Sequence, residues 1–505
     1  MIQANFEETS LFVRQSKIAG ETEIQCVLPL SESQVSKVLC VSPKVTLTGA
    51  EIIDGQVSYG GKAIFCVIYL DGDGNVKKAE CGAEFEQRLN INLEQEVLTP
   101  NVKLAVERAR LESVNGSLVV KAKVTSSVTL SCEKKIKYAT NGEELFLKKQ
   151  ECTVSKKICS KTAVYPIEEE FELNYAVEEV LLHKTQASVT AVSSGVGLVT
   201  VDGESYLSVC LLQKIEKSDI LKETKCFPFR FEVECEEVMP SSICEVSLLV
   251  KSCKLDVIVD EDAGKSQVKL SGQIAVSVNA YEDRSGEILV DTYSATNEVT
   301  VLKERETFFR PEEYRYQKTD LRLIGLLSES LLGGSRLTCV AIETVEITQA
   351  KRKDGGLTVE GVIDALAFIK DGEENILSKK IEVPFETFFD QITGCDFAVD
   401  ILVEEVKGKL ISLNEVELGV KMVLCVQSYK KEEIDFICGV EIGKEKRVKT
   451  QAMSVYIPLA GEELWDVAKR LNSSPEVILE INRDLTFPLT GEERLLIYRQ
   501  EKKNY

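Results

Sequence analysis

One pattern in this chain constrains its fold more than any other feature. A turn glycine followed by a long apolar run occurs three times, at Gly61, Gly203 and Gly361. A phenylalanine follows each glycine, at Phe85, Phe229 and Phe385. The three glycines are 142 and 158 residues apart. Solenoid repeats have periods of about 20–50 residues. The longer spacing therefore predicts whole domains in tandem rather than a solenoid.

Each copy continues with short runs in which apolar and polar residues alternate, as at Val102, Leu104 and Val106. Asp71-Gly72 and Asp371-Gly372 both come ten residues after the repeat glycine, and Asp-Gly between apolar runs indicates a hairpin turn. Short alternating strands separated by turns are typical of sandwiches and barrels. We therefore predict a mainly β chain of three tandem β-sandwich or barrel-like domains at 1–150, 151–300 and 301–442.

Two segments within these domains fit the strand pattern poorly. The polar and aromatic stretch Thr307 to Asp320 has no clean periodicity, and we interpret it as a connection between domains. Around Ala176 to Leu182 the apolar spacing is compatible with a short helix near the start of the second copy.

Composition excludes several functions. Lys and Arg total 61 against 82 Asp and Glu, so the net charge is −21. Such a chain is repelled by phosphate backbones and anionic lipid surfaces, and we expect no nucleic-acid partner. The longest apolar runs are too short for a membrane span. The N-terminus lacks the apolar stretch of a signal peptide, so we expect the protein to stay in the compartment where it is made.

The residues that carry most enzyme chemistry are missing or scattered. The chain has one histidine, His183, and no Gly-x-Ser-x-Gly or P-loop motif. Its 16 cysteines form no C-x-x-C pair and lie in apolar runs, which is typical of buried reduced thiols. Cross-linking of these thiols in a mature assembly is the alternative that the sequence leaves open. We expect no enzyme, no metal and no cofactor.

A different pattern occupies the C-terminus, after a charged linker predicted at 443–452. Val455-Tyr456-Ile457 is typical of a short strand. Leu464, Val467, Ala468 and Leu471 then mark one apolar helical face. Ser474-Pro475-Glu476 is a typical helix start, and Leu495 to Tyr498 is a second short strand. Residues 453–500 are therefore predicted to form a small α+β domain of order βααβ.

This segment resembles the LysM module. The residues that carry the resemblance are Tyr456, Gly461, Leu464, Trp465, Val467, Ala468, Ile478, Asn482, Leu489, Gly491, Leu495 and Ile497. Most LysM modules bind N-acetylglucosamine glycans such as peptidoglycan, in a groove between the first strand–helix turn and the loop after the second helix. The resemblance implies a groove lined by Ala460, Gly461, Glu462, Glu463, Leu464, Asn482, Arg483, Asp484 and Leu485.

The groove departs from the family pattern at one place. Gly461-Glu462-Glu463 stands where LysM modules usually have Gly-Asp-Thr, so a hydroxyl is lost and a carboxylate is gained. Burying that carboxylate against a neutral glycan is unfavourable. Trp465 is the only tryptophan, and we interpret it as a packing residue rather than a sugar-stacking one.

Three β-rich repeats followed by one C-terminal LysM-like segment also resemble the SipL-like family of clostridial spore-coat morphogenetic proteins. This resemblance implies a cytoplasmic adaptor of the mother cell that works at the forespore and spore coat surface. Its LysM module would dock onto the coat morphogenetic ATPase of the basement layer (sporulation stage IV protein A), with other coat proteins as further partners. The alternative is a peptidoglycan-binding protein of the cell wall or spore cortex, which the missing signal peptide and the abundant cysteines disfavour.

Overall fold

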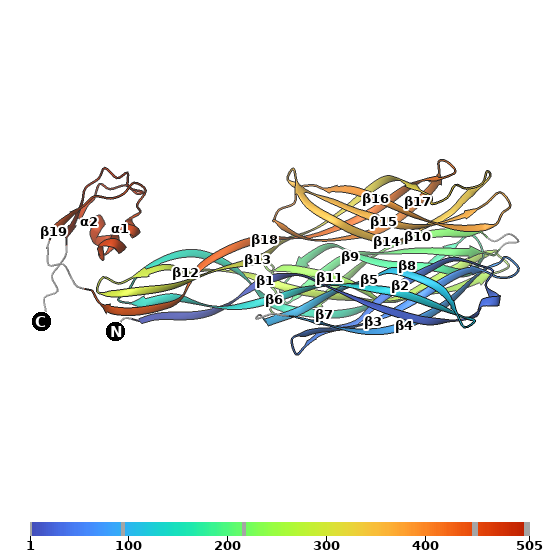
Figure 1. Ribbon diagram of the computed structural model, residues 1–505, viewed down its shortest axis with the longest axis horizontal. Coiled ribbons are helices and arrows are strands. Elements are labelled where there is room, and N and C mark those ends of the chain that lie inside the picture. Colours follow the sequence, from blue (N-terminus) through green and yellow to red (C-terminus); the bar gives the residue numbers. More distant parts are fainter. Residues whose placement is uncertain (1–2, 92–95, 215–218, 447–452, 499–505) are drawn as a thin grey trace.

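The computed structural model describes residues 3–91, 96–214, 219–446 and 453–498. It shows an elongated molecule (Figure 1) that is 78% strand and 4% helix, which confirms the prediction of a mainly β chain. No helix in the parts of the chain that the structure describes has the length and apolar content to traverse a lipid bilayer.

The strands fall into three sets with one shared plan. In the first set, the first strand pairs with the last strand. Three strands that lie between them in the sequence form a separate meander sheet. The sheets have the orders β1-β6-β5 and β2-β3-β4, both antiparallel, with a short 3-10 helix at Glu32–Gln34. The strands are β1 (Gln3–Ser31), β2 (Lys37–Ile53), β3 (Gln56–Leu70), β4 (Val76–Asn90), β5 (Glu96–Val114) and β6 (Ser117–Glu143).

The second and third sets repeat this plan. Their sheets have the orders β11-β12-β7 and β10-β9-β8, then β13-β18-β17 and β14-β15-β16. The second set contains β7 (Phe146–Leu173), β8 (Val177–Ser194), β9 (Leu198–Gln213), β10 (Ile220–Glu234), β11 (Ile243–Asp260) and β12 (Lys265–Tyr293). The third contains β13 (Asn297–Leu326), β14 (Arg336–Lys353), β15 (Gly356–Lys370), β16 (Ile376–Phe389), β17 (Asp396–Leu410) and β18 (Glu415–Glu445).

The two sheets of each set pack face to face. In the first set, buried Val57 and Phe65 of β3 share one apolar cluster with Val120 and Leu130 of β6. Each described sheet is open and none closes on itself, so the barrel-like alternative is wrong. The domain bounds stay a prediction, because strand pairing defines sheets rather than independently folding units.

The repeated glycine and phenylalanine are cross-strand partners in all three sets. The pairs are Gly61–Phe85, Gly203–Phe229 and Gly361–Phe385. A Cβ atom on the glycine would lie 2.4, 2.3 and 2.6 Å from the ring, respectively, so each ring covers a residue that must lack a side chain. The spacing of the pair is fixed by the hairpin between them.

The Asp-Gly turns are hairpin loops, as predicted. Asp71 Oδ1 accepts hydrogen bonds from the backbone N–H groups of Asp73 and Asn75, both at 2.9 Å. Asp371 Oδ1 accepts the equivalent two bonds at the β15–β16 loop, also at 2.9 Å. The side chain thus replaces a backbone acceptor and fixes the turn, as aspartate commonly does.

The three meander sheets contact one another in a closed ring, which we call the ring. Lys78 Nζ of the first set donates to the carbonyl of Val180 in the second, at 3.0 Å. Lys222 Nζ of the second set donates to the carbonyl of Val340 in the third, at 2.7 Å. Ser378 Oγ of the third donates to the carbonyl of Leu39 in the first.

These three donors occupy equivalent places, since each pairs with the residue seven positions after the repeat glycine. The contact therefore has the geometry of a head-to-tail trimer interface that closes within one chain. Its centre is apolar and combines all three sets: Leu39, Cys40, Ile68, Val76, Leu181, Cys210, Leu212, Ile220, Cys339, Leu366 and Phe368.

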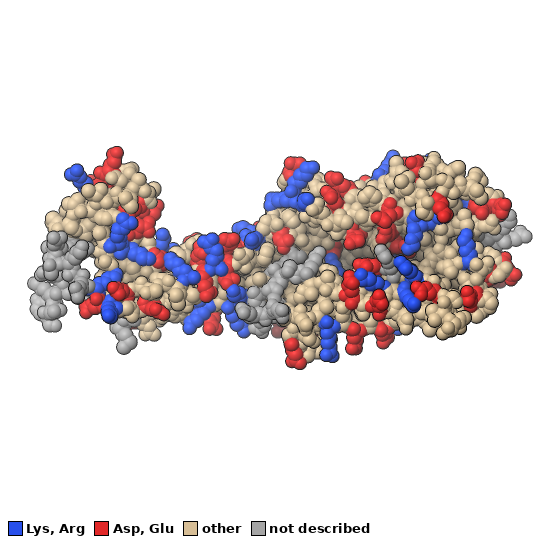
Figure 2. Space-filling view, viewed as in Figure 1, with Lys and Arg blue, Asp and Glu red and all other residues tan. Residues whose placement is uncertain are grey.

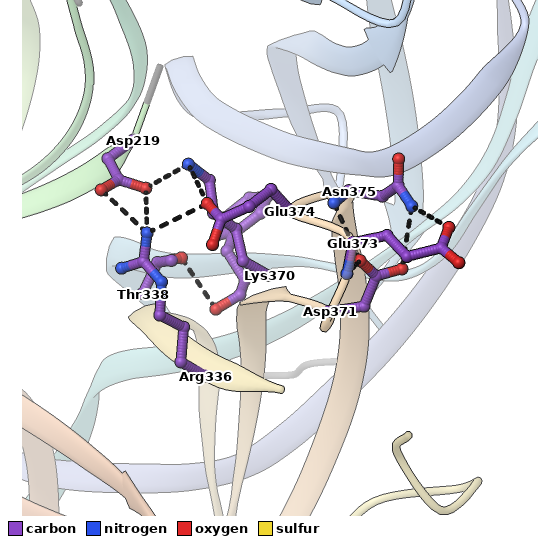
Figure 3. A network of polar contacts seen from close by, with 9 residues as sticks. Asp219, Arg336, Thr338, Lys370, Asp371, Glu373, Glu374 and Asn375 are labelled. Atoms are coloured by element: carbon purple, nitrogen blue, oxygen red, sulfur yellow. Dashed lines mark hydrogen bonds and ion pairs between the residues drawn. The ribbon is translucent and has the colours of Figure 1, made fainter. Parts of the chain in front are cut away.

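A polar network fastens the second set to the third (Figure 3). The Lys370 side chain is only 2% exposed, and its Nζ lies 2.7 Å from Asp219 Oδ1 and 3.4 Å from Glu374 Oε2. Arg336 donates to both oxygens of Asp219, each at 3.1 Å. A buried cation is tolerated only with such partners, and here its partner Asp219 belongs to the neighbouring set.

The first and last strands of every set extend beyond the sandwiches and form a stalk of three two-stranded ribbons, β1/β6, β7/β12 and β13/β18 (Figure 1). The stalk has its own apolar centre, to which all three ribbons contribute. Its buried members are Leu11, Ile136, Ile288, Phe308, Ile434 and Phe436.

Two local predictions are wrong. Thr307 to Asp320 is part of β13 and pairs with β18, and Phe308 is buried. A register shift between Pro311 and Tyr314 breaks the alternation there, which is why the strand was missed. Ala176 to Leu182 contains no helix: β8 begins at Val177, and two irregularities before Leu182 disturb its period of two.

The segment predicted as a linker begins within a strand. β18 continues to Glu445, three residues past the predicted domain end. Residues 447–452 lie outside the described residues.

Residues 453–498, the C-terminal module, have the predicted βααβ order. Its elements are β19 (Met453–Tyr456), α1 (Leu464–Leu471), α2 (Pro475–Ile481) and β20 (Leu495–Tyr498), and β19 pairs with β20 antiparallel. The predicted apolar face of α1 is confirmed, since Val467 and Ala468 are buried. Figure 2 shows a recess between this module and the sandwiches, above the stalk.

Candidate functional site

The first half of the predicted groove is the loop between β19 and α1. Gly461 adopts φ +87°, a left-handed conformation that favours glycine. Its N–H donates to the carbonyl of Leu489 at 2.7 Å, and the N–H of Leu489 donates to the carbonyl of Glu462 at 2.9 Å. The loop is therefore pinned to the chain near Leu489, beyond the predicted second half of the groove.

Glu462 points inward, contrary to the expectation that it lines a groove as an open carboxylate. The residue is 7% exposed. Its Oε2 accepts hydrogen bonds from Leu459 N–H and from the Tyr456 hydroxyl, both at 2.9 Å, and its Oε1 lies 2.6 Å from Arg470 Nη1. Burial, followed by the bond to Glu462, raises the pKa of Tyr456. The carboxylate is satisfied within the module and presents little charge outside it.

The other two predicted residues of this loop, Glu463 and Leu464, point in different directions: one side chain is exposed and the other faces the core. Glu463 is exposed at the start of α1, where its backbone N–H donates to Asp466 Oδ2 at 3.4 Å. Leu464 packs against the apolar core of the module. Of the two, only Glu463 offers a side chain to a ligand.

The second half of the predicted groove, residues 482–485, also contains both inward-facing and exposed side chains. Asn482 uses its whole amide internally: Nδ2 donates to the carbonyls of Ile478 and Leu496, at 2.8 and 2.9 Å, and Oδ1 accepts from Leu496 N–H at 2.7 Å. It fastens the end of α2 to β20. Leu485 is half-buried against the core, whereas Arg483 and Asp484 are exposed.

A pocket of about 440 Å³ opens on the module beside α1. It contains three of the predicted residues and none from 482–485. Its lining is Leu459, Ala460, Gly461, Glu462, Asp466, Lys469 and Arg470. Asp466, Lys469 and Arg470 were missed, although charges at positions i, i+3 and i+4 mark the polar face of a helix and could have indicated them.

The module also contacts the end of the stalk, through α1. Trp465 Nε1 donates to Asp291 Oδ2 at 2.8 Å, and Lys469 Nζ lies 2.8 Å from the same carboxylate. The Trp465 ring meets the edge of Tyr293 at 5.0 Å between centroids, and the Tyr293 hydroxyl donates to the carbonyl of Ser473 at 2.6 Å. Trp465 is thus a packing residue, and its partner is the stalk.

Asp291 is the centre of this contact. Burial raises its pKa, but hydrogen bonds from Lys469 and Trp465 and the charges of Lys469 and Lys303 outweigh burial, so the pKa lies below its ordinary value. Lys303 of β13 lies 3.2 Å from the carboxylate. The stalk end therefore holds an ionised aspartate for the module.

The one histidine lies far from this site in the sequence and in the fold. His183 is in β8, and its Nε2 is buried with no hydrogen-bond partner. Burial, with the positive charges of Lys44 and Lys78, lowers the pKa of His183 to about 4. The residue is neutral at physiological pH.

Comparison with protein families identifies one part of the chain. Residues 34–114 match the family model of the SipL SPOCS domain. The match spans the β2-β3-β4 sheet and β5, and it includes the Gly61–Phe85 pair. It supports a SipL-like sporulation protein. Comparisons with curated proteins and with solved structures found no match.

Proposed function

We propose that this protein is a non-enzymatic adaptor of spore-coat assembly, which works in the mother-cell cytoplasm at the forespore surface. The observation that carries the proposal is the SPOCS match at residues 34–114, in a chain whose other two strand sets repeat the same plan. Three linked sandwiches offer several surfaces for coat proteins, and sites on one chain reinforce one another through effective concentration.

The docking head in this proposal is the C-terminal module, which resembles LysM in sequence and has its βααβ order. Its partner is the coat morphogenetic ATPase of the basement layer, sporulation stage IV protein A. The pocket at Leu459 to Arg470 and the exposed Glu463 form the surface that we assign to this contact.

Peptidoglycan binding is the second candidate, and one observation favours it. The carboxylate of Glu462 is turned inward and paired with Arg470. A neutral glycan at the pocket would therefore not have to desolvate that charge, and this removes one argument against glycan binding.

Co-sedimentation separates the two candidates. The full-length chain and a chain that ends at residue 446 are each mixed with polymerised coat ATPase and, separately, with purified peptidoglycan. We expect the full-length chain to sediment with the ATPase polymer and the shortened chain to stay in solution. Sedimentation of the full-length chain with peptidoglycan alone would reject the adaptor proposal in favour of glycan binding.

A further inference from the structure

The contact between α1 and the stalk is small, and one carboxylate organises it. The Asp291 side chain is 13% exposed and accepts from both Trp465 and Lys469. The stalk adds the ring of Tyr293, and Lys446 donates to Asn472 at the rim. Charge-assisted hydrogen bonds to Asp291 accompany a small apolar contact, in which Tyr293 and Phe146 of the stalk join the core of the module.

Lys469 belongs to this contact and to the pocket at the same time. Its ammonium lies 2.8 Å from Asp291, while its side chain lines the pocket beside Asp466. Asp466 is one helical turn away, at the spacing where a lysine commonly pairs with an aspartate. The stalk contact and the pocket therefore share one side chain, Lys469.

The contact covers a tryptophan, Trp465, and tryptophan is among the residues most enriched in binding hot spots. Here the stalk occupies that hot spot with a carboxylate and an aromatic ring, Asp291 and Tyr293.

We propose that this contact is a latch. In the closed state seen here, Asp291 covers Trp465 and Lys469; in the open state, the same two side chains take a partner protein that presents a carboxylate beside an aromatic ring. The proposal deepens the proposed function, since it treats the module as the docking head and names the chemistry of its partner. A partner with that chemistry competes with the stalk, so binding opens the latch.

Fluorescence of the single tryptophan reports the closed state in the full-length chain. We expect Asp291→Asn to shift Trp465 emission to longer wavelength and to increase its quenching by acrylamide. Lys469→Gln should do the same from the module side. The matched control is Asp256→Asn, an exposed aspartate on β11 that pairs with Lys254. Emission unchanged in both latch variants would overturn the proposal.

The partner chemistry is tested with a peptide of residues 286–297 of this chain, which carries Asp291 and Tyr293. We expect the full-length Asp291→Asn variant to bind this peptide at least tenfold more tightly than the wild type, because the wild-type stalk competes for the same surface. A peptide carrying the Asp291→Asn substitution should bind neither chain. Equal binding to both chains, or binding to neither, contradicts the latch.

These readouts do not use the coat ATPase, so the two proposals fail separately. Peptide binding without ATPase capture rejects the proposed function and keeps the latch. ATPase capture without any response of Trp465 or the peptide rejects the latch alone.

Discussion

The sandwiches and the C-terminal module are attached in opposite ways. The three strand sets hold one another through contacts that recur around the ring, with an apolar centre supplied by all three. The module meets the end of the stalk through the Asp291 carboxylate and through the Tyr293 ring, which packs against the apolar cluster of the module. Apolar burial in the ring is lost only by unfolding, whereas a charge-assisted contact can be exchanged for another partner. The ring thus has an apolar centre shared by all three sets, and the latch proposal makes the module an exchangeable head on that scaffold.

The largest expected effect comes from the ring centre. Phe368 is fully buried between the sets, so Phe368→Ala should lower the free energy of unfolding by about 3–5 kcal/mol, measured by urea denaturation with circular dichroism. The control is Phe388→Ala, at a ring that is 41% exposed, with an expected loss of about 1 kcal/mol or less. Equal losses in the two variants would show that the apolar centre does not hold the scaffold.

Acid should weaken the scaffold through His183. Its folded pKa, about 4, lies below the usual value of 6.5, so the unfolded chain binds more protons in between. Stability from this residue is complete above pH 6.5 and falls as pH drops towards 4, by up to about 3 kcal/mol. Urea titrations at pH 7 and pH 4.5 should show a smaller loss in His183→Gln than in the wild type. Parallel losses would place the acid sensitivity elsewhere.

A smaller effect is expected at the repeat glycines. In Gly203→Ala, the new methyl group would lie 2.3 Å from the Phe229 ring and 2.6 Å from the carbonyl of Ser188. The ring and strand must move, and we expect thermal unfolding to reveal a loss of about 1–3 kcal/mol. Gly419→Ala is the matched control, because a methyl group on this strand glycine would project into open space, with no neighbouring side chain within 4 Å. A loss of equal size there would mean that strand glycines are costly to replace for reasons other than the ring.

The smallest effect on folding is expected at Glu463. It is exposed at the start of α1, so Glu463→Gln should leave thermal unfolding and Trp465 emission as in the wild type. Capture of the coat ATPase should nevertheless fall several-fold in co-sedimentation. The control is Glu480→Gln, an exposed acid of α2 that lies outside both the predicted groove and the surface assigned to the ATPase. Undiminished capture by the Glu463 variant would move the interface off this surface.

The sequence revealed the parts of the fold that leave a local signature. The Gly–Phe pairs are each joined by one hairpin, so their spacing is nearly constant, at 24 residues in the first and third sets and 26 in the second, and can be found. The ring could not be found, since its contacts join distant residues such as Ser378 and Leu39 without any shared local pattern. In the β13 segment, a register shift concealed a strand.

Only part of the candidate site could be predicted, because the sequence shows local motifs but not the contacts of distant residues. Family resemblance located Ala460 to Glu462 at the pocket, but a residue's place in a motif does not show which way its side chain points. Glu462 and Asn482 turned out to serve the module internally. The role of Trp465 depended on Asp291, which is 174 residues away in sequence.

The closed ring has a consequence for biosynthesis. The contact from Ser378 to Leu39 spans 339 residues, so a ribosome must complete β16 before the first sheet finds its last neighbour. A product that ended after the second set would lack the partner for Lys222 on that set and for Leu39 on the first. It would also leave the apolar centre of the ring open to solvent, because the third set supplies part of that centre. Such a product would be prone to self-association, since a large exposed apolar patch favours contact with other molecules.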